Sequence, residues 1–342
     1  MKALNLTATS TFELIEVEVP MIGSDEVLVE VKATGICGSD VHGIDGSSGR
    51  RIPPVIMGHE SAGVIAKVGE AVADWNVGQR VTFDSTIYCN QCPFCVSGRV
   101  NLCDQRRVLG VSCGEYNQPG AFAQFISVPA RILYEIPETM SFAEAAFCEP
   151  VAVALHAVKR VGVQPGNSAV VIGAGIIGLL IVQALKDAGC QHVIAVDLDP
   201  FKLEMAKQLG ADTVIMGGEG AEERVLHSTQ GNGVHVAMEV VGISATVDLA
   251  VNVLAKGGSL GCVGNISPAV EFPWQKMVTR ELTVYGSCAI QNEYPLAIEK
   301  IDSGAIQVQP MISMIVPLSD GADWFARLHR NDENLLKVIL EP

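Results

Sequence analysis

The sequence is poor in positive charge and contains no uninterrupted hydrophobic run long enough to span a membrane. Lysine and arginine total 23 against 38 aspartate and glutamate residues, which gives a formal net charge of −15. A surface of this charge repels phosphate groups, so binding to nucleic acid or to an anionic membrane is not expected. The most apolar stretch, residues 169–185, is interrupted by three glycines, so we predict a buried strand and helix there.

The sequence also lacks a recognisable secretory signal. Residues 1–20 contain no apolar core followed by a cleavage site of small residues, so we expect a cytosolic (cytoplasmic) protein. Thiols stay reduced in the cytosol, so the ten cysteines are expected to bind metal or to lie singly in the core. The length of 342 residues predicts two domains, and a hydrophobic content of 49% predicts a folded globular chain.

Two patterns of hydrophobic residues divide the chain. Period-two alternation predicts strands at residues 26–35, 60–69, 79–83 and 122–129. Further on, predicted strands at 169–172, 192–199, 235–242 and 259–264 alternate with predicted helices at 176–189, 200–211 and 245–258. The second pattern indicates βαβ units and a parallel sheet. The predicted fold is therefore α/β, with a β-rich domain at residues 1–148 and 291–342 and a doubly wound parallel-sheet domain at residues 149–290.

A glycine-rich turn, GAGIIG at residues 173–178, follows the first strand of the parallel-sheet domain. Gly173 permits the tight turn, Gly175 lets a pyrophosphate approach the backbone, and Gly178 lets the helix pack closely on the strand. The free N–H groups at the start of that helix favour phosphate. The pattern predicts a dinucleotide site, and a glycine turn that binds another ligand is the alternative.

Asp197 ends the next predicted strand, about 20 residues beyond the turn, where an acidic residue binds the ribose hydroxyls of NAD. Leu198 follows, and no arginine stands beside it to bind a 2′-phosphate, so we predict NAD rather than NADP. Lys202 is a candidate for contact with the adenine ribose, and an ordinary solvated helix lysine is the alternative.

Four cysteines lie within fifteen residues, at Cys89, Cys92, Cys95 and Cys103. The C-x2-C-x2-C-x7-C spacing is typical of a metal site, and four thiolates close a tetrahedral shell around zinc without an open position for substrate. We therefore predict a structural zinc, with an iron–sulfur cluster or disulfides as the alternatives. The reaction itself is expected elsewhere in the chain.

Cys37, His59 and Glu60 offer the sulfur, nitrogen and oxygen donors of a second, open zinc site. A catalytic zinc keeps about three protein ligands and one position for water or substrate. Each residue also has an ordinary interpretation, as a buried thiol, a core histidine and a surface acid.

The order of these motifs resembles that of the zinc-dependent medium-chain dehydrogenases over essentially the whole chain. The resemblance rests on G-I-C-G-S-D-V-H at residues 35–42, G-H-E at 58–60, the four-cysteine loop, E-P at 149–150 and G-A-G-I-I-G at 173–178. It implies a GroES-like catalytic domain interrupted by a Rossmann domain, two zinc ions per subunit, NAD between the domains, and a homodimer or homotetramer. Residues 283–287 are a candidate edge strand for subunit assembly.

Glu149 implies the polyol branch, similar to sorbitol dehydrogenases, because the alcohol dehydrogenases proper carry cysteine near that point. The implied ligands of the catalytic zinc, besides water, are Cys37, His59 and one or both of Glu60 and Glu149. Cys148 is expected to point away if Glu149 points in. A carboxylate in place of a thiolate gives a harder Lewis acid and allows ligand exchange during turnover.

The resemblance also implies roles for residues around the metal and the cofactor. Asp40 is expected to hold the second ring nitrogen of His59, or to cap a turn. Ser39 and His42 form the implied proton relay, with a solvent-facing histidine as the alternative for His42. The cofactor-binding residues are expected to be Gly173, Gly175, Ile177, Gly178, Asp197, Lys202, Val263 and Gly264, the last two near the nicotinamide.

The expected reaction is oxidation of a secondary alcohol of a polyol or sugar derivative, with hydride transfer to NAD. The proton would leave through Ser39, the nicotinamide ribose and His42. Sorbitol itself is disfavoured, because the arginine–tyrosine pair of sorbitol dehydrogenases is absent from residues 287–295, SCAIQNEYP. Arg50 and Arg51 are candidates for steering a sugar acid or sugar phosphate, and a solvated loop is the alternative.

Three other functions are compatible with parts of the pattern. A threonine-type dehydrogenase shares much of the ligand set. A non-enzymatic nucleotide-binding relative would lack a ligand or relay residue, and none is missing. A zinc-free quinone reductase would lack the four-cysteine loop.

Overall fold

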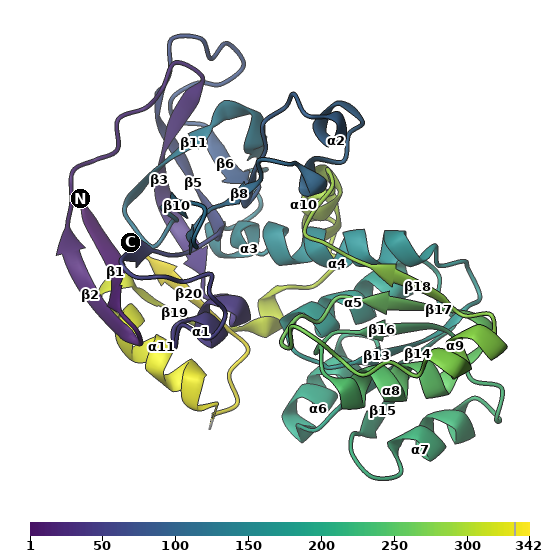
Figure 1. Cartoon of the computed structure of the whole chain (residues 1–342). Helices are drawn as coiled ribbons and strands as arrows, with labels where there is room; N and C mark the ends of the chain where they lie inside the picture. The colour runs from purple at the N-terminus through teal and green to yellow at the C-terminus, as the bar shows by residue number, and fades with distance from the viewer. Residues whose placement is uncertain (332) are drawn as a thin grey trace. The chain divides into compact units, whose positions relative to one another are not determined.

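The computed structural model describes residues 1–331 and 333–342, which form two compact units (Figure 1). Unit 1 comprises Met1–Glu149, Ile290–Ser303 and Val308–Pro342, and unit 2 comprises Pro150–Ala289 and Gly304–Gln307. Within the described residues, no helix combines the length and the hydrophobicity that crossing a membrane requires.

Unit 1 is built on a seven-stranded sheet in the order β12-β6-β5-β3-β20-β19, with β11 also paired to β3. The alternating residues Val27, Val29 and Val31 of β3 are almost fully buried, which is the reason this segment forms a central strand. The strands of this sheet are β3 (Glu26–Gly35), β5 (Glu60–Val68), β6 (Arg80–Phe83), β11 (Phe125–Pro129), β12 (Leu133–Glu135), β19 (Ile312–Pro317) and β20 (Lys337–Glu341).

The register of β3, β5 and β20 brings three distant parts of the sequence together. In the antiparallel β3–β5 pair Gly35 lies opposite Glu60, and in the antiparallel β3–β20 pair Gly35 lies opposite Ile339. The end of β3 therefore lies beside the starts of both β5 and β20. A Cβ atom at Gly35 would lie 2.4 Å from Oε2 of Glu60, so any larger residue there would displace this carboxylate.

Smaller elements surround the large sheet. A three-stranded sheet has the order β2-β1-β4, and the pairs β7–β8 and β9–β10 are short antiparallel ladders. The strands are β1 (Lys2–Ala8), β2 (Thr11–Glu16), β4 (Val55–Ile56), β7 (Thr86–Ile87), β8 (Arg107–Val108), β9 (Val111–Ser112) and β10 (Asn117–Gln118). The helices of unit 1 are α1 (Gly38–Gly43), α2 (Pro93–Val96), α3 (Phe142–Ala146), α10 (Tyr294–Asp302) and α11 (Gly321–Arg330), and α4 (Cys148–Val161) begins in unit 1 and continues in unit 2.

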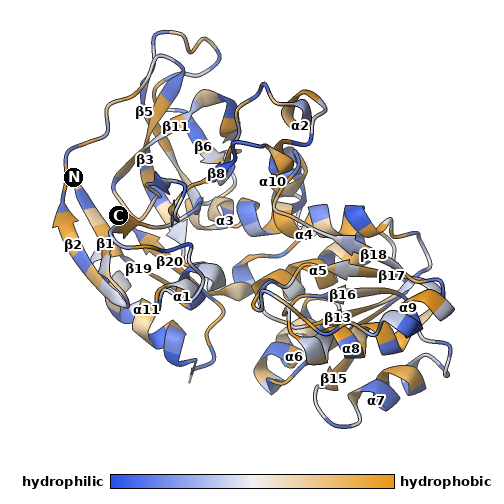
Figure 2. Ribbon diagram, in the orientation of Figure 1, coloured by the Kyte–Doolittle hydropathy of each residue, from blue (hydrophilic) through white to orange (hydrophobic). Residues whose placement is uncertain are grey.

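Unit 2 contains a parallel six-stranded sheet in the order β15-β14-β13-β16-β17-β18. Its strands carry mainly hydrophobic residues, as Figure 2 shows, because helices cover both faces of a sheet of this kind. The strands are β13 (Ser168–Ile172), β14 (His192–Asp197), β15 (Thr213–Met216), β16 (Val234–Glu239), β17 (Leu254–Cys262) and β18 (Thr283–Gly286). The helices are α5 (Ile176–Asp187), α6 (Pro200–Gln208), α7 (Ala221–Ser228), α8 (Ser244–Val253) and α9 (Trp274–Thr279).

The structure confirms the predicted change from antiparallel to parallel sheet. It also confirms an edge strand at the predicted place, β18, which ends at Gly286, one residue earlier than predicted. The helix predicted at 245–258 is wrong beyond Val253. Leu254 is extended, with a ψ of 145°, and β17 begins there without a connecting loop. Gly257 has a φ of +74°, which does not fit a helix, so the Lys-Gly-Gly stretch prevents the helix from continuing. The strand predicted from residue 122 begins at Phe125, because the backbone of Phe122 bonds to Leu4 and Met57 instead.

Candidate functional site

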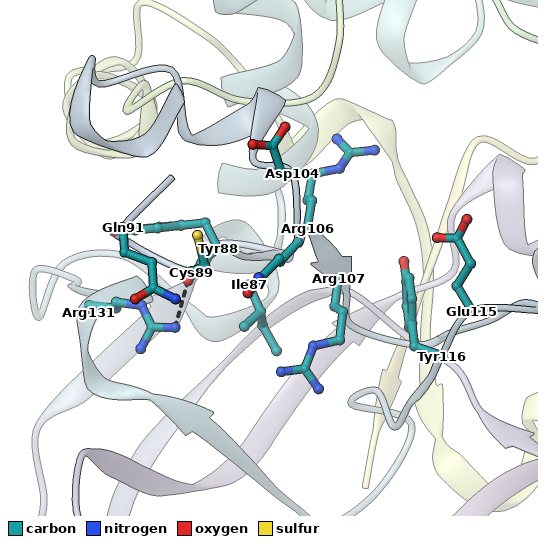
Figure 3. A pocket seen from close by; sticks show the side chains of 11 residues that line it. Ile87, Tyr88, Cys89, Gln91, Asp104, Arg106, Arg107, Glu115, Tyr116 and Arg131 are labelled. Carbon is teal, nitrogen blue, oxygen red and sulfur yellow. Dashed lines mark hydrogen bonds between the residues drawn. The ribbon is translucent and has the colours of Figure 1, made fainter. Parts of the chain in front are cut away.

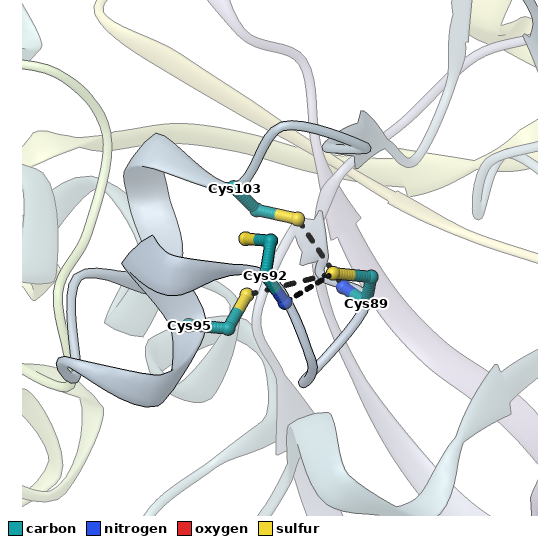
Figure 4. Close-up of side chains that lie close together, drawn as sticks. All are labelled: Cys89, Cys92, Cys95 and Cys103. Carbon is teal, nitrogen blue, oxygen red and sulfur yellow. Dashed lines mark hydrogen bonds between the residues drawn. The ribbon is translucent and has the colours of Figure 1, made fainter.

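Four cysteine thiols converge in the loop between β7 and β8 (Figure 4). The sulfur atoms of Cys89, Cys92, Cys95 and Cys103 all lie within 4.8 Å of one another, and those of Cys89 and Cys95 are 3.9 Å apart. Tetrahedral zinc with Zn–S bonds of about 2.3 Å would place two sulfurs roughly 3.8 Å apart. All four thiols are free, so the disulfide alternative is wrong for this structure. The arrangement fits a closed, structural zinc.

The surroundings of these sulfurs favour the thiolate at one position and disfavour it at another. The N–H of Cys92 donates to Sγ of Cys89 at 3.4 Å, and the N–H of Cys89 donates to Sγ of Cys103 at 3.3 Å. Backbone donation from Cys95 and Asp104 lowers the pKa of Cys92 to about 6, whereas burial raises the pKa of Cys95 to about 12. A divalent cation would supply the positive charge that a buried Cys95 thiolate needs.

Cys37, His59 and Glu60 form a second group of potential ligands, whose donor atoms all lie within 4.8 Å of one another. Cys37 lies between β3 and α1, and the other two residues stand at the start of β5, so the β3–β5 pairing brings the three together. Loss of solvation raises the pKa of the Cys37 thiol, and the neighbouring Glu60 carboxyl raises it further. A mixed set of sulfur, nitrogen and oxygen donors fits zinc, whose charge would stabilise the thiolate.

The Glu149 carboxyl stands apart from this mutual cluster. Its Oε1 accepts a hydrogen bond from Oγ of Ser85 at 2.9 Å, and the side chain is 8% exposed. Burial raises the pKa of Glu149 to about 7, and the charge of nearby His59 lowers it. The Glu149 carboxyl therefore interacts with His59 by charge, but it is not part of the group whose ligand atoms all lie within 4.8 Å of one another. The neighbouring Cys148 is buried, and burial raises the pKa of its thiol.

Lys337, which the sequence analysis missed, holds the Glu60 carboxylate. Its Nζ lies 2.5 Å from Oε2 of Glu60 and donates to the carbonyl oxygen of Ile36 at 3.0 Å. Both charged side chains are 2% exposed, so neither charge has water to compensate it. A lone lysine between Leu336 and Val338 in an apolar strand was the available signal, because a buried lysine needs a partner.

Asp40 lies next to His59, with Oδ2 3.6 Å from Nδ1, which is beyond a hydrogen bond. The other carboxylate oxygen, Oδ1, accepts from Nε and Nη2 of Arg51 at 2.9 and 2.6 Å. Arg51 is only 5% exposed, so both sequence interpretations of this residue, as a steering charge and as part of a solvated loop, are wrong. Its neighbour Arg50 is exposed. The turn-cap alternative for Asp40 is also wrong, because its carboxylate binds this guanidinium.

The two predicted relay residues lie on α1. Oγ of Ser39 donates to Sγ of Cys37 at 3.2 Å, so the hydroxyl contacts a candidate ligand directly. His42 is exposed and lies one helical turn further on, and residues three apart share a helix face.

The glycine-rich turn in unit 2 has the steric properties that the sequence predicts. Gly173 has a φ of +97°, and a Cβ at Gly178 would lie 1.8 Å from the carbonyl oxygen of Gly173. A Cβ at Gly175 would meet nothing within 4 Å, so the backbone there is open to a ligand. Helix α5 begins at Ile176 and directs its free N–H groups toward this space.

Asp197 ends β14 and binds the glycine-rich turn. Its Oδ2 accepts from the N–H of Ala174 at 2.6 Å, and Oδ1 accepts from the N–H of Asp199 at 2.9 Å. Leu198 is 75% exposed. The ammonium of Lys202 lies 3.8 Å from Oδ2 of Asp199, so this lysine forms a local ion pair on α6.

Glu239 is a second residue that the sequence analysis missed. Its buried carboxylate accepts from the N–H groups of Val241 and Gly242 and from the Thr246 hydroxyl at 2.8–2.9 Å. Its backbone carbonyl accepts from the N–H groups of the two predicted nicotinamide contacts, Val263 and Gly264. The available sequence signal was the position of Glu239 at the end of the apolar stretch HVAME, where an acidic residue is expected to be buried.

A separate cavity of about 490 Å³ lies beside the cysteine loop (Figure 3). Its lining includes Tyr88, Cys89, Arg106, Arg107 and Arg131. Nη2 of Arg131 donates to the carbonyl oxygen of Tyr88 at 2.7 Å. None of the residues of the Cys37–His59–Glu60 group lines it, so this cavity does not define the substrate site.

Comparison with known proteins gives the same two-part division. Residues 23–138 match the alcohol dehydrogenase GroES-like domain, and residues 177–303 match the zinc-binding dehydrogenase family. The chain belongs to the zinc-dependent medium-chain dehydrogenases. Sorbitol dehydrogenase of Bacillus subtilis (strain 168) is 35% identical over 100% of this chain and 97% of its own, and L-idonate 5-dehydrogenase of Vitis vinifera is 33% identical over 90% and 85%.

Solved structures agree with this family membership. A zinc-binding dehydrogenase from Sinorhizobium meliloti 1021, bound to NADP, has a TM-score of 0.91 at 33% identity and covers 100% of this chain and 99% of its own. This member of the family therefore has a GroES-like domain and a Rossmann-like domain of the nucleotide-binding type. A zinc-free quinone reductase and a non-enzymatic relative are not favoured by these similarities.

Proposed function

We propose that this dehydrogenase oxidises a secondary hydroxyl group of a polyol or related sugar derivative to a ketone, with NAD as the hydride acceptor. The cluster of Cys37, His59 and Glu60 carries the proposal, because three mixed donors leave a tetrahedral metal one position for substrate. The similarity to B. subtilis sorbitol dehydrogenase and V. vinifera L-idonate 5-dehydrogenase supports a polyhydroxylated substrate.

Cys37 and His59 would hold the catalytic zinc together with a carboxylate from Glu60 or Glu149. When bound, zinc supplies Lewis acidity that lowers the pKa of a hydroxyl group toward neutrality. Each carboxylate has one oxygen already engaged, by Lys337 in one case and by Ser85 in the other. Each therefore keeps one oxygen for a metal, and this supports an exchange of the two carboxylates as ligands when substrate enters.

Ser39 and His42 would carry the substrate proton to solvent. The Ser39 hydroxyl contacts the sulfur of Cys37 at 3.2 Å, and His42 is exposed one turn further along α1. Ser39 would accept the proton and pass its own toward His42 through the nicotinamide ribose hydroxyl. The remaining task of the protein is to orient the substrate carbon toward the nicotinamide and to exclude water.

The preference for NAD rests on Asp197. Its carboxylate would accept hydrogen bonds from both adenosine ribose hydroxyls and would repel a 2′-phosphate. The exposed side chain beside it, Leu198, offers no positive charge for that phosphate. The structure of the S. meliloti relative is bound to NADP, and kinetics with both nucleotides test the preference of this chain.

A panel of hexitols, pentitols, aldonates, sugar phosphates, L-threonine and simple monoalcohols, assayed by NADH absorbance, tests this function. We expect turnover of a polyol or sugar derivative with NAD, and loss of turnover after chelation. A preference for monoalcohols would refute the polyol assignment, and turnover of L-threonine would select the threonine-type alternative.

The same dehydrogenase is proposed to be a cytosolic homodimer or homotetramer. All ten cysteines are free, which agrees with a reducing compartment. Strand β18 is an edge of its sheet and exposes 39% of Val284, which supports an edge-to-edge contact between subunits. Light scattering of the purified protein gives the number of subunits.

A further inference from the structure

Arg51 is a buried charged side chain next to the candidate metal cluster, and the mechanism above does not use it. Its Nε and Nη2 donate to a single oxygen of Asp40, Oδ1, and Nη1 donates to the carbonyl oxygen of Arg50 at 2.9 Å. Asp40 is fully buried. Burying two charges in this way costs desolvation free energy, which is compensated only by good geometry.

The backbone and the packing hold Arg51 in one place. Arg51 forms a parallel bridge with Ser112, whose carbonyl oxygen accepts from the N–H of Ile52 and whose N–H donates to Arg50. A Cβ atom at Gly43 would lie 2.7 Å from Cγ of Arg51. The Arg51 side chain therefore packs against Gly43 of α1. A larger residue at position 43 would displace it.

The second oxygen of Asp40 faces a candidate metal ligand. Oδ2 of Asp40 and Nδ1 of His59 are 3.6 Å apart, and within residues 1–331 and 333–342 neither atom has a hydrogen-bond partner. Because Nδ1 faces Asp40, Nε2 is the nitrogen of His59 that remains for a metal. The two carboxylate oxygens thus connect a guanidinium on one side to an imidazole on the other.

The charge of Arg51 decides how Asp40 acts on His59. With the guanidinium on Oδ1, the buried carboxylate has a counter-charge and is held in place, so Oδ2 stays opposite Nδ1 and orients the imidazole ring. Nη2 of Arg51 also lies 3.5 Å from Oγ of Ser39, whose hydroxyl donates to Sγ of Cys37.

We propose that Arg51 is a positioning residue for the metal centre: by binding Oδ1 of Asp40 it holds Oδ2 opposite Nδ1 of His59, so that Nε2 stays directed at the metal, and its Nη2 also contacts the Ser39 hydroxyl group. This inference rests on the metal cluster of the proposed function. The predicted effect is on metal retention, which is measured without any assay of turnover.

Zinc content and chelator resistance of Arg51→Met, Arg51→Lys and Arg50→Met test this proposal. Wild type is expected to hold two zinc ions per subunit. Arg51→Met should lose the zinc of the Cys37–His59–Glu60 cluster at chelator concentrations roughly 10–100-fold lower than wild type, because loss of an outer-shell partner has that effect on metal affinity. The four-cysteine zinc should stay. Arg51→Lys should recover part of the resistance, and Arg50→Met, which alters an exposed side chain, should match wild type.

The double variant Asp40→Asn/Arg51→Met keeps the test decisive if Arg51→Met folds poorly. Removing both charges leaves no buried carboxylate without a counter-charge, and an asparagine oxygen can take the place of Oδ2 opposite Nδ1 of His59, so the double variant should retain zinc better than Arg51→Met alone. Arg51→Met with wild-type chelator resistance, or a double variant that loses zinc more readily than the single one, would overturn the inference. Wild type with a single, cysteine-bound zinc would instead refute the proposed function.

Discussion

The ammonium group of Lys337 and the carboxylate of Glu60 form an ion pair that is 2% exposed on both sides, with Nζ 2.5 Å from Oε2. Lys337 belongs to β20 and Glu60 to β5, and both flank the end of β3. One member of the candidate metal cluster is therefore held by a strand 277 residues away in the sequence.

Lys337→Met should destabilise unit 1, because it leaves the Glu60 carboxylate buried without its counter-charge. Breaking a buried ion pair on one side costs about 3–5 kcal/mol. Urea unfolding followed by circular dichroism measures the loss. A bound zinc would compensate part of the Glu60 charge, so we expect a larger loss after chelation than in the zinc-loaded protein. The control is Lys337→Met/Glu60→Gln, which should recover part of the stability, and a single variant as stable as wild type would contradict this account.

Cys37→Ala should abolish turnover without abolishing NADH binding. Cys37 belongs to unit 1, whereas the glycine-rich turn and Asp197 belong to unit 2, so the nucleotide site keeps its own residues. Loss of Lewis-acid catalysis worth several kcal/mol corresponds to a fall in kcat of at least about 10³-fold. Steady-state kinetics and NADH fluorescence titration provide the two readouts. Turnover within tenfold of wild type would refute the catalytic role of the cluster.

Cys92→Ser should act on stability and not on chemistry. The four thiols form a closed cluster, so losing one should release the structural zinc and lower the melting temperature, while the remaining folded enzyme keeps its turnover. Metal analysis should give one zinc fewer per subunit. If thermal stability and zinc content both match wild type, the structural assignment of this loop is wrong.

Asp197→Asn should shift the cofactor preference from NAD toward NADP. Asparagine can still accept from the N–H of Ala174, so the turn keeps its bond, but the charge that repels a 2′-phosphate is gone. Loss of charge-assisted hydrogen bonds of about 1.5–3 kcal/mol should lower kcat/KM for NAD roughly 10–100-fold. Asp199→Asn, which alters the N-cap of α6 two residues further on, is the matched control and should leave the NAD/NADP ratio unchanged.

Asp84 should make unit 1 less stable as the pH rises toward 8. Burial raises the pKa of Asp84 to about 7, although the N–H of Thr86 donates to Oδ1 at 2.8 Å. The folded state therefore keeps a proton that the unfolded chain releases near pH 4, so the stability from this proton is complete below pH 4 and is lost as the pH rises through about 7. Urea unfolding of the zinc-loaded protein at a series of pH values measures the slope.

Asp84→Asn isolates this effect from other carboxyl groups, because the amide mimics the protonated acid at every pH. The difference in unfolding free energy between variant and wild type should grow from near zero at pH 4 to a few kcal/mol at pH 8, in favour of the variant. A difference that is constant across this range would show that Asp84 does not titrate in it.

The sequence predicts features that depend on short stretches of chain. The alternation in residues 26–35 gives β3 with the same bounds as the structure, and the short motifs around Cys37 and Gly173 give candidate ligands and a nucleotide turn. The local hydrophobic pattern predicts the wrong secondary structure where two sequence signals disagree. Residues 254–258 continue the helical spacing of α8, but Gly257 and Gly258 within this stretch and the pairing of Leu254 with β16 make it a strand.

The counter-charges of the site could not be predicted in this way. The apolar neighbours of Lys337 indicate its burial and Arg51 looks like a surface residue, but nothing near either residue in the chain shows which carboxylate it meets. Their partners are set by the register of β20 on β3 and by the position of Arg51 beside α1. Burial of a charge depends on tertiary structure, and only the fold shows which opposite charge compensates it.

The interruption of unit 1 by unit 2 has a consequence for the order of folding. Unit 2 is almost wholly one continuous segment, Pro150–Ala289, whereas the large sheet of unit 1 needs β19 and β20 from beyond it. During synthesis the whole segment Pro150–Ala289 leaves the ribosome before β20 does. At that stage β3 still lacks the strand β20 that pairs with it. The ion pair between Glu60 and Lys337 can form only after β20 has been synthesised, and closing the long loop between the two strands costs conformational entropy. Assembly of the metal centre should therefore be a late and slow step of folding.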